Sequence, residues 1–453
     1  MKKYLSKIQN FLLKIQNFKI KYFISELKRR NPFGAIIALI TFIFLILFYF
    51  TIPAYYNYEN FDKEIQKKVL KDFKIDIKNI KKIRYSILPV PHFLIEESDL
   101  YFVNDSKEKI INAKNLKINV FTKNLHKKEK IELKNIILNK ATLDLQFIDI
   151  KNFYQHIKNH NTKPIYLNNG NLFFRDKDKE IILISKIKKF EYFFNLQNNE
   201  KKINILGNLF GSNFNFKWDK DFLNPHITKS NFKFSNPNIN ITSKFDRKNI
   251  NYVKSQTTVN FLQNNLILNY NLNNNSIELV DDKSKKINYS KLVGDINLNP
   301  FFFDLNLILS GISIETLLNN VFLNLYKLNK SSHLNFNGNL KINLNHINNR
   351  LFERLVLNIN FLENEINLNK SSLNLKKVGK INFSDPLIYE KNEKVYVKSK
   401  ITFDVNDQQE LYKRFLIPRQ NRIDLKKVYF ELEYNIDEGN YYLSDINFTE
   451  SIE

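Results

Sequence analysis

The chain of 453 residues has no cysteine, only 9 glycines and 10 prolines, and a single tryptophan. The lack of cysteine excludes a disulfide scaffold, thiolate metal sites and a cysteine nucleophile. Because glycine and proline are scarce, no Pro/Gly-rich linker divides the chain after its N-terminal part. Hydrophobic residues make up 43% of the chain, which is enough to form a core and argues against global disorder.

Motifs that carry enzyme chemistry are also absent. The sequence has no G-x-S-x-G nucleophile elbow, and Gly207 and Gly211 do not have the spacing of a P-loop or a dinucleotide-binding loop. His156 and His160 are four residues apart, but no third ligand and no zincin glutamate accompany them, so a solvated pair on a polar helix is the favoured interpretation. We therefore expect no enzyme activity, no catalytic or metal-binding residue and no cofactor.

An uncharged apolar segment of 21 residues extends from Phe33 to Pro53. As an α-helix it would be roughly 31 Å long, which matches the hydrocarbon thickness of a bilayer. Arg29 and Arg30 precede it and no A-x-A cleavage site follows, which favours an uncleaved signal anchor over a buried core helix or a cleaved signal peptide. The predicted anchor residues are Phe33, Ile36, Ile37, Leu39, Ile40, Phe42, Ile43, Phe44, Leu45, Ile46, Leu47 and Phe48.

Positive charge is concentrated before this segment. The formal net charge is +24, and the first 30 residues hold nine Lys or Arg residues against Glu26 alone. By the positive-inside rule, residues 1–32 form a cytoplasmic leader and residues 54–453 lie across the membrane. The leader repeats KIQNF at Lys7–Phe11 and Lys14–Phe18, so it either forms an amphipathic helix on the inner leaflet or is a solvated tail. No zinc-finger, RNP or basic-zipper pattern accompanies the charge, so we expect no nucleic-acid partner.

Helical periodicity gives way to strand periodicity after the segment. Phe61, Ile65, Val69 and Phe73 recur every four residues and predict one amphipathic helix. From there most apolar residues recur every second position, most regularly in the stretch 334–344 and again in 355–361, 266–272 and 214–218. Alternation of this kind is typical of antiparallel strands with one apolar and one wet face.

Three further helices are predicted among the strands. A short one covers Lys151–His160. A stronger one follows Gly311, with Ser313 as its N-cap, and the last spans about Asp407–Phe415 and ends before Pro418. No regular strand–helix alternation of a parallel sheet occurs.

The predicted fold is therefore mostly β with a few helices. After an N-terminal single transmembrane helix, residues 54–453 form a long, curved, mainly antiparallel sheet of about 25 strands. Periodicity cannot separate a closed sandwich from an open apolar groove, but the polar wet face and the lack of a domain break favour the groove, capped by short amphipathic helices. The candidate groove-lining residues are Leu266, Leu268, Tyr270, Leu334, Phe336, Leu340, Ile342, Leu344, Leu357, Ile359 and Phe361.

Two prolines interrupt a β-forming stretch, RYSILPVPHFLIEESDLYF at 84–102. Proline cannot donate a ladder hydrogen bond, so we expect Pro89 and Pro91 at a turn or edge of the sheet rather than within a central strand.

The stretch ILPVPHFLIEESDLYF and the pattern that follows it resemble the start of an AsmA-like protein of a Gram-negative envelope. In that pattern Ile131, Leu133, Ile136, Leu138, Ala141, Leu143 and Leu145 take the apolar positions. The stretches Pro164–Asp176 and Val293–Leu318 also resemble later parts of such proteins. The long cytoplasmic leader and the Asn/Lys-rich strands depart from the family pattern.

The resemblance implies a periplasmic β-groove anchored in the bacterial inner membrane, similar to TamB and to repeating-β-groove lipid transporters. Its partners would be the inner membrane and phospholipid, whose acyl chains the groove would shield during transfer to the outer membrane, in support of outer-membrane biogenesis. The alternative is a non-transporting structural or assembly factor, whose sheet edges engage outer-membrane or envelope assembly proteins.

Overall fold

The computed structural model of the chain describes residues 32–56, 58–102, 111–146, 149, 163–176, 179–221, 223–224, 226–249, 252–262, 264–272, 276–280, 290–298, 300–330, 337–345, 347, 351–362 and 365–450. The chain forms two compact units. The first comprises Met1–Ala141, Asn152–Asn168 and Glu191–Lys201, and the second comprises Thr142–Lys151, Asn169–Phe190 and Lys202–Glu453. The predicted boundaries after residues 32 and 53 rest on membrane topology and stay predictions.

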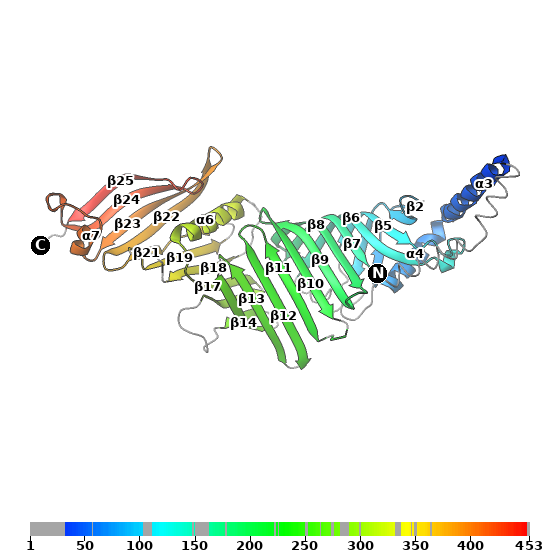
Figure 1. The fold of residues 1–453 in the computed structure, drawn as a ribbon, viewed down its shortest axis with the longest axis horizontal. Coiled ribbons are helices and arrows are strands. Elements are labelled where there is room, and N and C mark those ends of the chain that lie inside the picture. Colours follow the sequence, from blue (N-terminus) through cyan, green and yellow to red (C-terminus); the bar gives the residue numbers. More distant parts are fainter. Residues whose placement is uncertain are drawn as a thin grey trace. The chain divides into compact units, whose positions relative to one another are not determined.

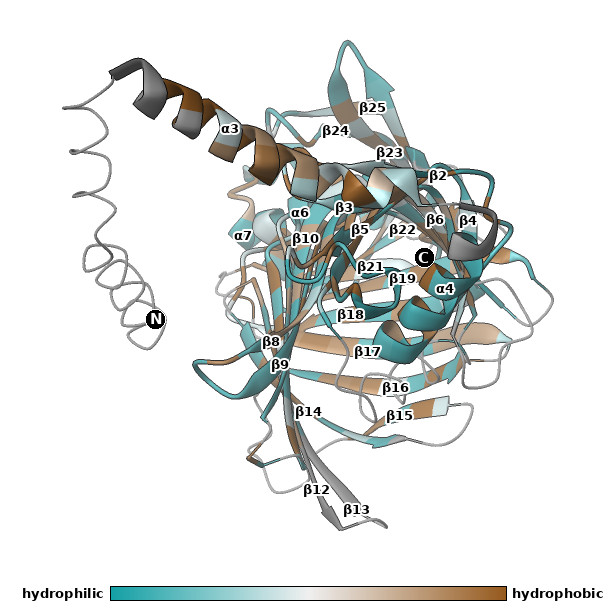
Figure 2. Cartoon of the chain, turned by 90° about the vertical axis from the view of Figure 1, so that its right-hand side faces the viewer, coloured by the Kyte–Doolittle hydropathy of each residue, from teal (hydrophilic) through white to brown (hydrophobic). Residues whose placement is uncertain are grey.

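The first unit begins with the helix α3 (Pro32–Thr51), which has no charged residue and is mostly brown in Figure 2. Its predicted anchor side chains from Ile36 to Phe48 are 40–71% exposed, whereas the side chain of Phe33 lies outside the described residues. Over the residues that the structure describes, no helix is both long enough and apolar enough to count as a membrane span. The anchor stays a prediction.

The second helix of this unit, α4 (Tyr58–Phe73), follows the short 3-10 helix η1 (Ile52–Tyr55) and confirms the period-four prediction. Ile65, Val69 and Phe73 are all buried. At its other surface, Lys68 Nζ donates to the carbonyl oxygens of Lys128, Glu129 and Ile131 at 2.8–3.1 Å. The helix is therefore fixed by an apolar stripe on one side and by a lysine that binds a loop on the other.

Five strands complete most of the first unit: β1 (Ile75–Lys78), β2 (Ile83–Ser86), β3 (His92–Ile95), β4 (Ser98–Phe102) and β5 (Ile111–Val120). They pair antiparallel as β1–β4–β5–β3–β2. Pro89 and Pro91 lie in the connection between β2 and β3. As expected, neither occupies a ladder position, and the Pro91 carbonyl accepts a hydrogen bond from the Val120 N–H at 3.1 Å.

Four longer strands are divided between the two units, namely β6 (Leu133–Gln146), β7 (Ile165–Arg175), β8 (Ile181–Asn195) and β9 (Glu200–Leu209), and the 3-10 helix η2 (Lys128–Lys130) precedes them.

The second unit contains a continuous series of paired strands (Figure 1). Consecutive strands pair antiparallel except where β20 and β21 both pair with β19 and where β17 and β18 run parallel. The strands are β10 (Ser212–Asp221), β11 (Ile227–Phe234), β12 (Ile239–Asn249), β13 (Tyr252–Phe261), β14 (Asn264–Leu272), β15 (Ser276–Val280), β16 (Lys291–Leu298), β17 (Phe301–Ser310), β18 (Asn337–Asn345), β19 (Arg354–Leu362), β20 (Glu365–Asn367), β21 (Ser371–Leu375), β22 (Gly379–Lys391), β23 (Lys394–Val405), β24 (Leu425–Asn435) and β25 (Tyr441–Glu450).

The predictions of a mostly β chain and a mainly antiparallel sheet are confirmed, and the described residues contain 25 strands. The parallel pair β17–β18 was not predicted. It exists because the chain between these two strands forms the helix α6 (Ile314–Lys330), and a parallel connection requires a crossover of that kind.

The two predicted helices of this unit that fall on described residues are confirmed. In α6 the Ser313 Oγ accepts a hydrogen bond from the Thr316 N–H at 3.1 Å, as an N-cap does. In α7 (Gln408–Arg414) Asp407 caps the Glu410 N–H at 2.9 Å, and the 3-10 helix η3 (Arg419–Asn421) begins after Pro418. The helix predicted over Lys151–His160 lies outside the described residues.

Alternation along the strands gives the sheet of the second unit two different faces. On one face Leu344 opposes Leu355, and both are fully buried. On the other face asparagines pair across strands: Asn343 Nδ2 donates to Asn306 Oδ1 at 2.6 Å, and Asn231 Nδ2 donates to Asn240 Oδ1 at 2.8 Å. Neutral amide pairs therefore join neighbouring strands on the polar face.

Candidate functional site

The apolar face of the second unit contains a cavity of about 740 Å³, called cavity A here. Strands from β12 to β19, the hairpin turn at 236–237 and α6 contribute to its walls. Seven of the predicted groove-lining residues line it together: Leu266, Leu268, Tyr270, Leu340, Ile342, Ile359 and Phe361. Three different strands, β14, β18 and β19, supply these residues, because each strand presents alternate side chains to the same face.

The other four predicted lining residues are not in cavity A. Leu344 is fully buried in the core between strand and helix. Leu357 lines a second cavity described below. Leu334 and Phe336 lie outside the described residues.

Sequence reasoning missed the part of the wall that comes from other strands. Ile239 and Ile241 of β12, Val259 and Phe261 of β13, and Leu307 of β17 also line cavity A. Each belongs to a stretch with the same period-two signal, so the pattern could have included them. The contribution of α6 could not be read in this way, since periodicity does not show which cavity a helix faces.

Most polar side chains that line cavity A form hydrogen bonds within the protein. Thr257 Oγ1 donates to Ser243 Oγ at 2.8 Å and lies 3.4 Å from the Tyr270 hydroxyl. On α6, Asn320 Nδ2 donates to the Thr316 carbonyl at 2.7 Å and Asn324 Nδ2 to the Asn320 carbonyl at 2.5 Å. A ligand in this cavity is therefore offered apolar contact rather than a set of convergent polar groups.

A second apolar cavity of about 350 Å³, called cavity B, lies in the same unit. Its walls come from β19 and β21 to β25, and from α6 through Leu318 and Phe322. Figure 1 shows α6 beside β22, which it contacts. No charged residue is among the described residues that line either cavity.

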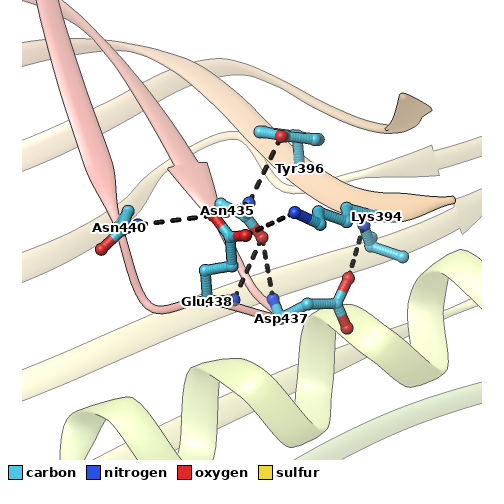
Figure 3. A network of polar contacts seen from close by, with 7 residues as sticks. Lys394, Tyr396, Asn435, Asp437, Glu438 and Asn440 are labelled. Carbon is cyan, nitrogen blue, oxygen red and sulfur yellow. Dashed lines mark hydrogen bonds and ion pairs between the residues drawn. The ribbon is translucent and has the colours of Figure 1, made fainter. Parts of the chain in front are cut away.

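A hairpin turn beside cavity B packs against α6. Ile436 is buried with Val395 and Val397, and Phe322 and Tyr326 of α6 pack against this group. Figure 3 shows the polar contacts of the same turn. The Val395 N–H donates to Asp437 Oδ2 at 2.8 Å, and Lys394 Nζ donates to the Glu438 carboxylate.

Two carboxylates in this region, those of Glu390 and Glu438, have a lowered pKa. The hydrogen bond from the Tyr326 hydroxyl, followed by that from Lys330, lowers the pKa of Glu390. The hydrogen bond from Lys394 lowers the pKa of Glu438 in the same way. Burial, with a smaller effect of the Glu315 charge, raises the pKa of Tyr434, whose hydroxyl donates to Asn319 Oδ1 at 2.9 Å. The contacts of Glu390 and Tyr434 attach α6 to β22 and β24.

Within the part of the chain that the structure describes, no group of three or more His, Cys, Asp or Glu side chains is arranged to hold a metal ion. His92 is buried in β3, and burial lowers its pKa. Its Nδ1 lies 2.6 Å from the carbonyl oxygen of Val90 in the turn before it.

Comparison with known proteins does not identify a family. No family model matches the chain, and no curated protein matches it significantly.

Proposed function

We propose that the second unit binds the acyl chains of phospholipid in cavity A and shields them from water during transfer between two membranes. The observation that supports this most directly is the composition of the cavity wall. It is apolar, and the hydrogen bonds of Thr257, Asn320 and Asn324 are made within the protein. Each methylene buried there contributes about 0.8 kcal/mol, so hydrocarbon is the class of ligand that gains most from binding.

The proposal includes the membrane anchor and the localisation that the sequence predicts. The uncharged helix α3 exposes the side chains of Ile36 to Phe48, which is unfavourable in water and favourable in lipid. With the basic leader it supports a single-pass inner-membrane protein whose residues 54–453 lie in the periplasm. The resemblance of the sequence to AsmA-like proteins supports a role in outer-membrane biogenesis.

The test is lipid retention by the full chain. The protein is extracted in mild detergent, and bound phospholipid is measured by mass spectrometry. We expect Ile342→Asp and Ile359→Asp to lower bound phospholipid at least fivefold, because a charge on a buried wall opposes hydrocarbon. Leu340→Asp, at a partly buried wall position, tests the same point at less risk to folding. Lys341→Asp is the matched control, since Lys341 is exposed on the opposite face of β18.

Phospholipid loss in Leu340→Asp with retention in Lys341→Asp supports the proposal. If the parent chain carries no phospholipid, or if both variants keep it, cavity A is not an acyl-chain site.

A second candidate function rests on the last strand. β25 pairs with β24, and among the described residues no strand pairs with its other edge. Five large side chains of β25 are exposed: Tyr441, Tyr442, Leu443, Ile446 and Phe448. An exposed apolar edge can add a strand from another protein, as an assembly factor for outer-membrane proteins would. Crosslinking through β25 to such proteins, in a chain without bound lipid, would favour this function.

A further inference from the structure

We infer that cavity B is a second acyl-chain site, separated from cavity A by α6, so that the protein holds two hydrocarbon chains in two compartments of one sheet face. The inference rests on the proposed function, because cavity A must first be an acyl-chain site for cavity B to be the second one.

Both cavities lie on the same face of the sheet. Leu357, Ile359 and Phe361 are alternate residues of β19 and therefore point to the same side. Ile359 and Phe361 line cavity A, whereas Leu357 lines cavity B. One strand thus passes beneath both compartments.

The helix α6 is the wall between them. Val321, Leu325 and Leu328 face cavity A. Leu318 and Phe322, from an adjacent stripe of the helix, face cavity B. Leu317 is fully buried and belongs to the same core as the strand pair Leu344–Leu355, so the helix is seated on the sheet by close packing.

The chemistry of cavity B selects hydrocarbon. Ser371 Oγ donates to the Leu368 carbonyl at 2.7 Å and accepts from the Asn358 N–H at 3.0 Å. Ser399 Oγ donates to the Ser384 carbonyl at 2.8 Å, and the Tyr434 hydroxyl donates to Asn319. The buried polar atoms of this wall therefore have partners within the protein, and a polar ligand would lose hydrogen bonds to water without replacing them.

The size of cavity B indicates a smaller occupant than that of cavity A. Its volume is about 350 Å³, against about 740 Å³ for cavity A. A cavity at the lower end of the usual range for small ligands suits one chain of a lipid rather than a whole lipid.

Photo-crosslinking can test the two compartments separately. Benzoylphenylalanine replaces Phe245 in the wall of cavity A or Phe383 in the wall of cavity B, both partly buried aromatic positions. The probe is phosphatidylethanolamine with two palmitoyl chains, supplied in detergent to the full chain, and lipid adducts are counted by mass spectrometry. Each position is then combined with a cavity-filling variant, Ile277→Trp in cavity A or Ile381→Trp in cavity B.

We expect adducts at both positions in the parent chain. Ile381→Trp should lower the adduct at position 383 at least fivefold and change that at position 245 less than twofold, and Ile277→Trp should do the reverse. The unaffected position shows in each case that the protein is folded.

Other outcomes contradict separate parts of the argument. Adducts at position 245 without any at position 383 would overturn the second site and leave the proposed function intact. If either filling variant lowers both adducts equally, the two cavities are one site and α6 is not a wall. The absence of adducts at position 245 would overturn the proposed function itself.

Discussion

Both units contain amphipathic strands, but the apolar faces of these strands are covered to different extents in the two units. In the first unit helix and strands bury the apolar side chains, and the two fully buried phenylalanines among the described residues, Phe73 and Phe93, both belong to it. In the second unit cavities A and B lie on the apolar face, and many wall residues, such as Tyr270 and Leu340, are only half-buried.

The difference lies in what covers each sheet. In the first unit α4 contacts β1 along an apolar stripe, and most of the strands around it are short. In the second unit the only long helix among the described residues is α6, which covers part of a series of sixteen strands. A period-two pattern therefore predicts that a face is apolar, but the ratio of covering helix to sheet decides whether that face becomes a core or a cavity wall.

The largest test of this comparison is truncation of one phenylalanine in each unit. Phe93→Ala removes a fully buried ring and should lower the free energy of unfolding by about 3–5 kcal/mol. Phe245→Ala removes a half-buried ring from the wall of cavity A and should cost only about 1–2 kcal/mol, since less apolar surface returns to water. Urea unfolding of the full chain measures both, and equal losses would mean that the face lined by Phe245 is closed like the first unit.

A smaller effect is expected when the N-cap of α6 is removed. Ser313→Ala removes the acceptor for the Thr316 N–H and should destabilise the second unit by about 1 kcal/mol. Ser313→Asp keeps an acceptor and should stay near the parent. Hydrogen exchange of α6 amides is the measurement, with α7 amides as the internal reference. Equal exchange in all three proteins would show that α6 is held by its packing alone.

The smallest effect concerns pH. Because hydrogen bonds from Tyr326 and Lys330 lower the pKa of Glu390 below its ordinary value of 4.5, their stabilisation is present above about pH 4.5 and is lost as the pH falls below it. Glu390→Gln should therefore be less stable than the parent at pH 6, and this difference should shrink toward pH 3. The exposed neighbour Glu393 supplies the control variant Glu393→Gln. If the difference in stability between Glu390→Gln and the parent stayed constant with pH, the contact would have no ionic component.

Much of the strand and helix structure followed from local patterns. The stretches 266–272 and 355–361 became β14 and β19, and Ser313 and Asp407 cap the helices that their positions predicted. These features depend on residues close together in sequence, for which periodicity and capping chemistry are sufficient.

The division of the apolar face into cavities A and B could not be predicted in this way, because it depends on contacts between residues far apart in sequence. Alternation assigns Leu344, Leu357 and Ile359 to one apolar face without showing what covers each of them. In the structure Leu344 lies in a closed core, Leu357 lines cavity B and Ile359 lines cavity A. The frequent asparagines were equally ambiguous. A sequence does not show whether an asparagine reflects a compositional bias or forms a cross-strand pair such as Asn306–Asn343.

The single parallel pair found among the described strands, β17–β18, determines how many compartments the second unit has. Hairpins can extend an antiparallel sheet indefinitely on the same face with nothing crossing it, so each added hairpin lengthens a cavity. A parallel pair needs a long crossover, and here that crossover is α6. Compartment number in such a protein is thus a property of strand direction, and a chain with a second parallel pair would be divided into three.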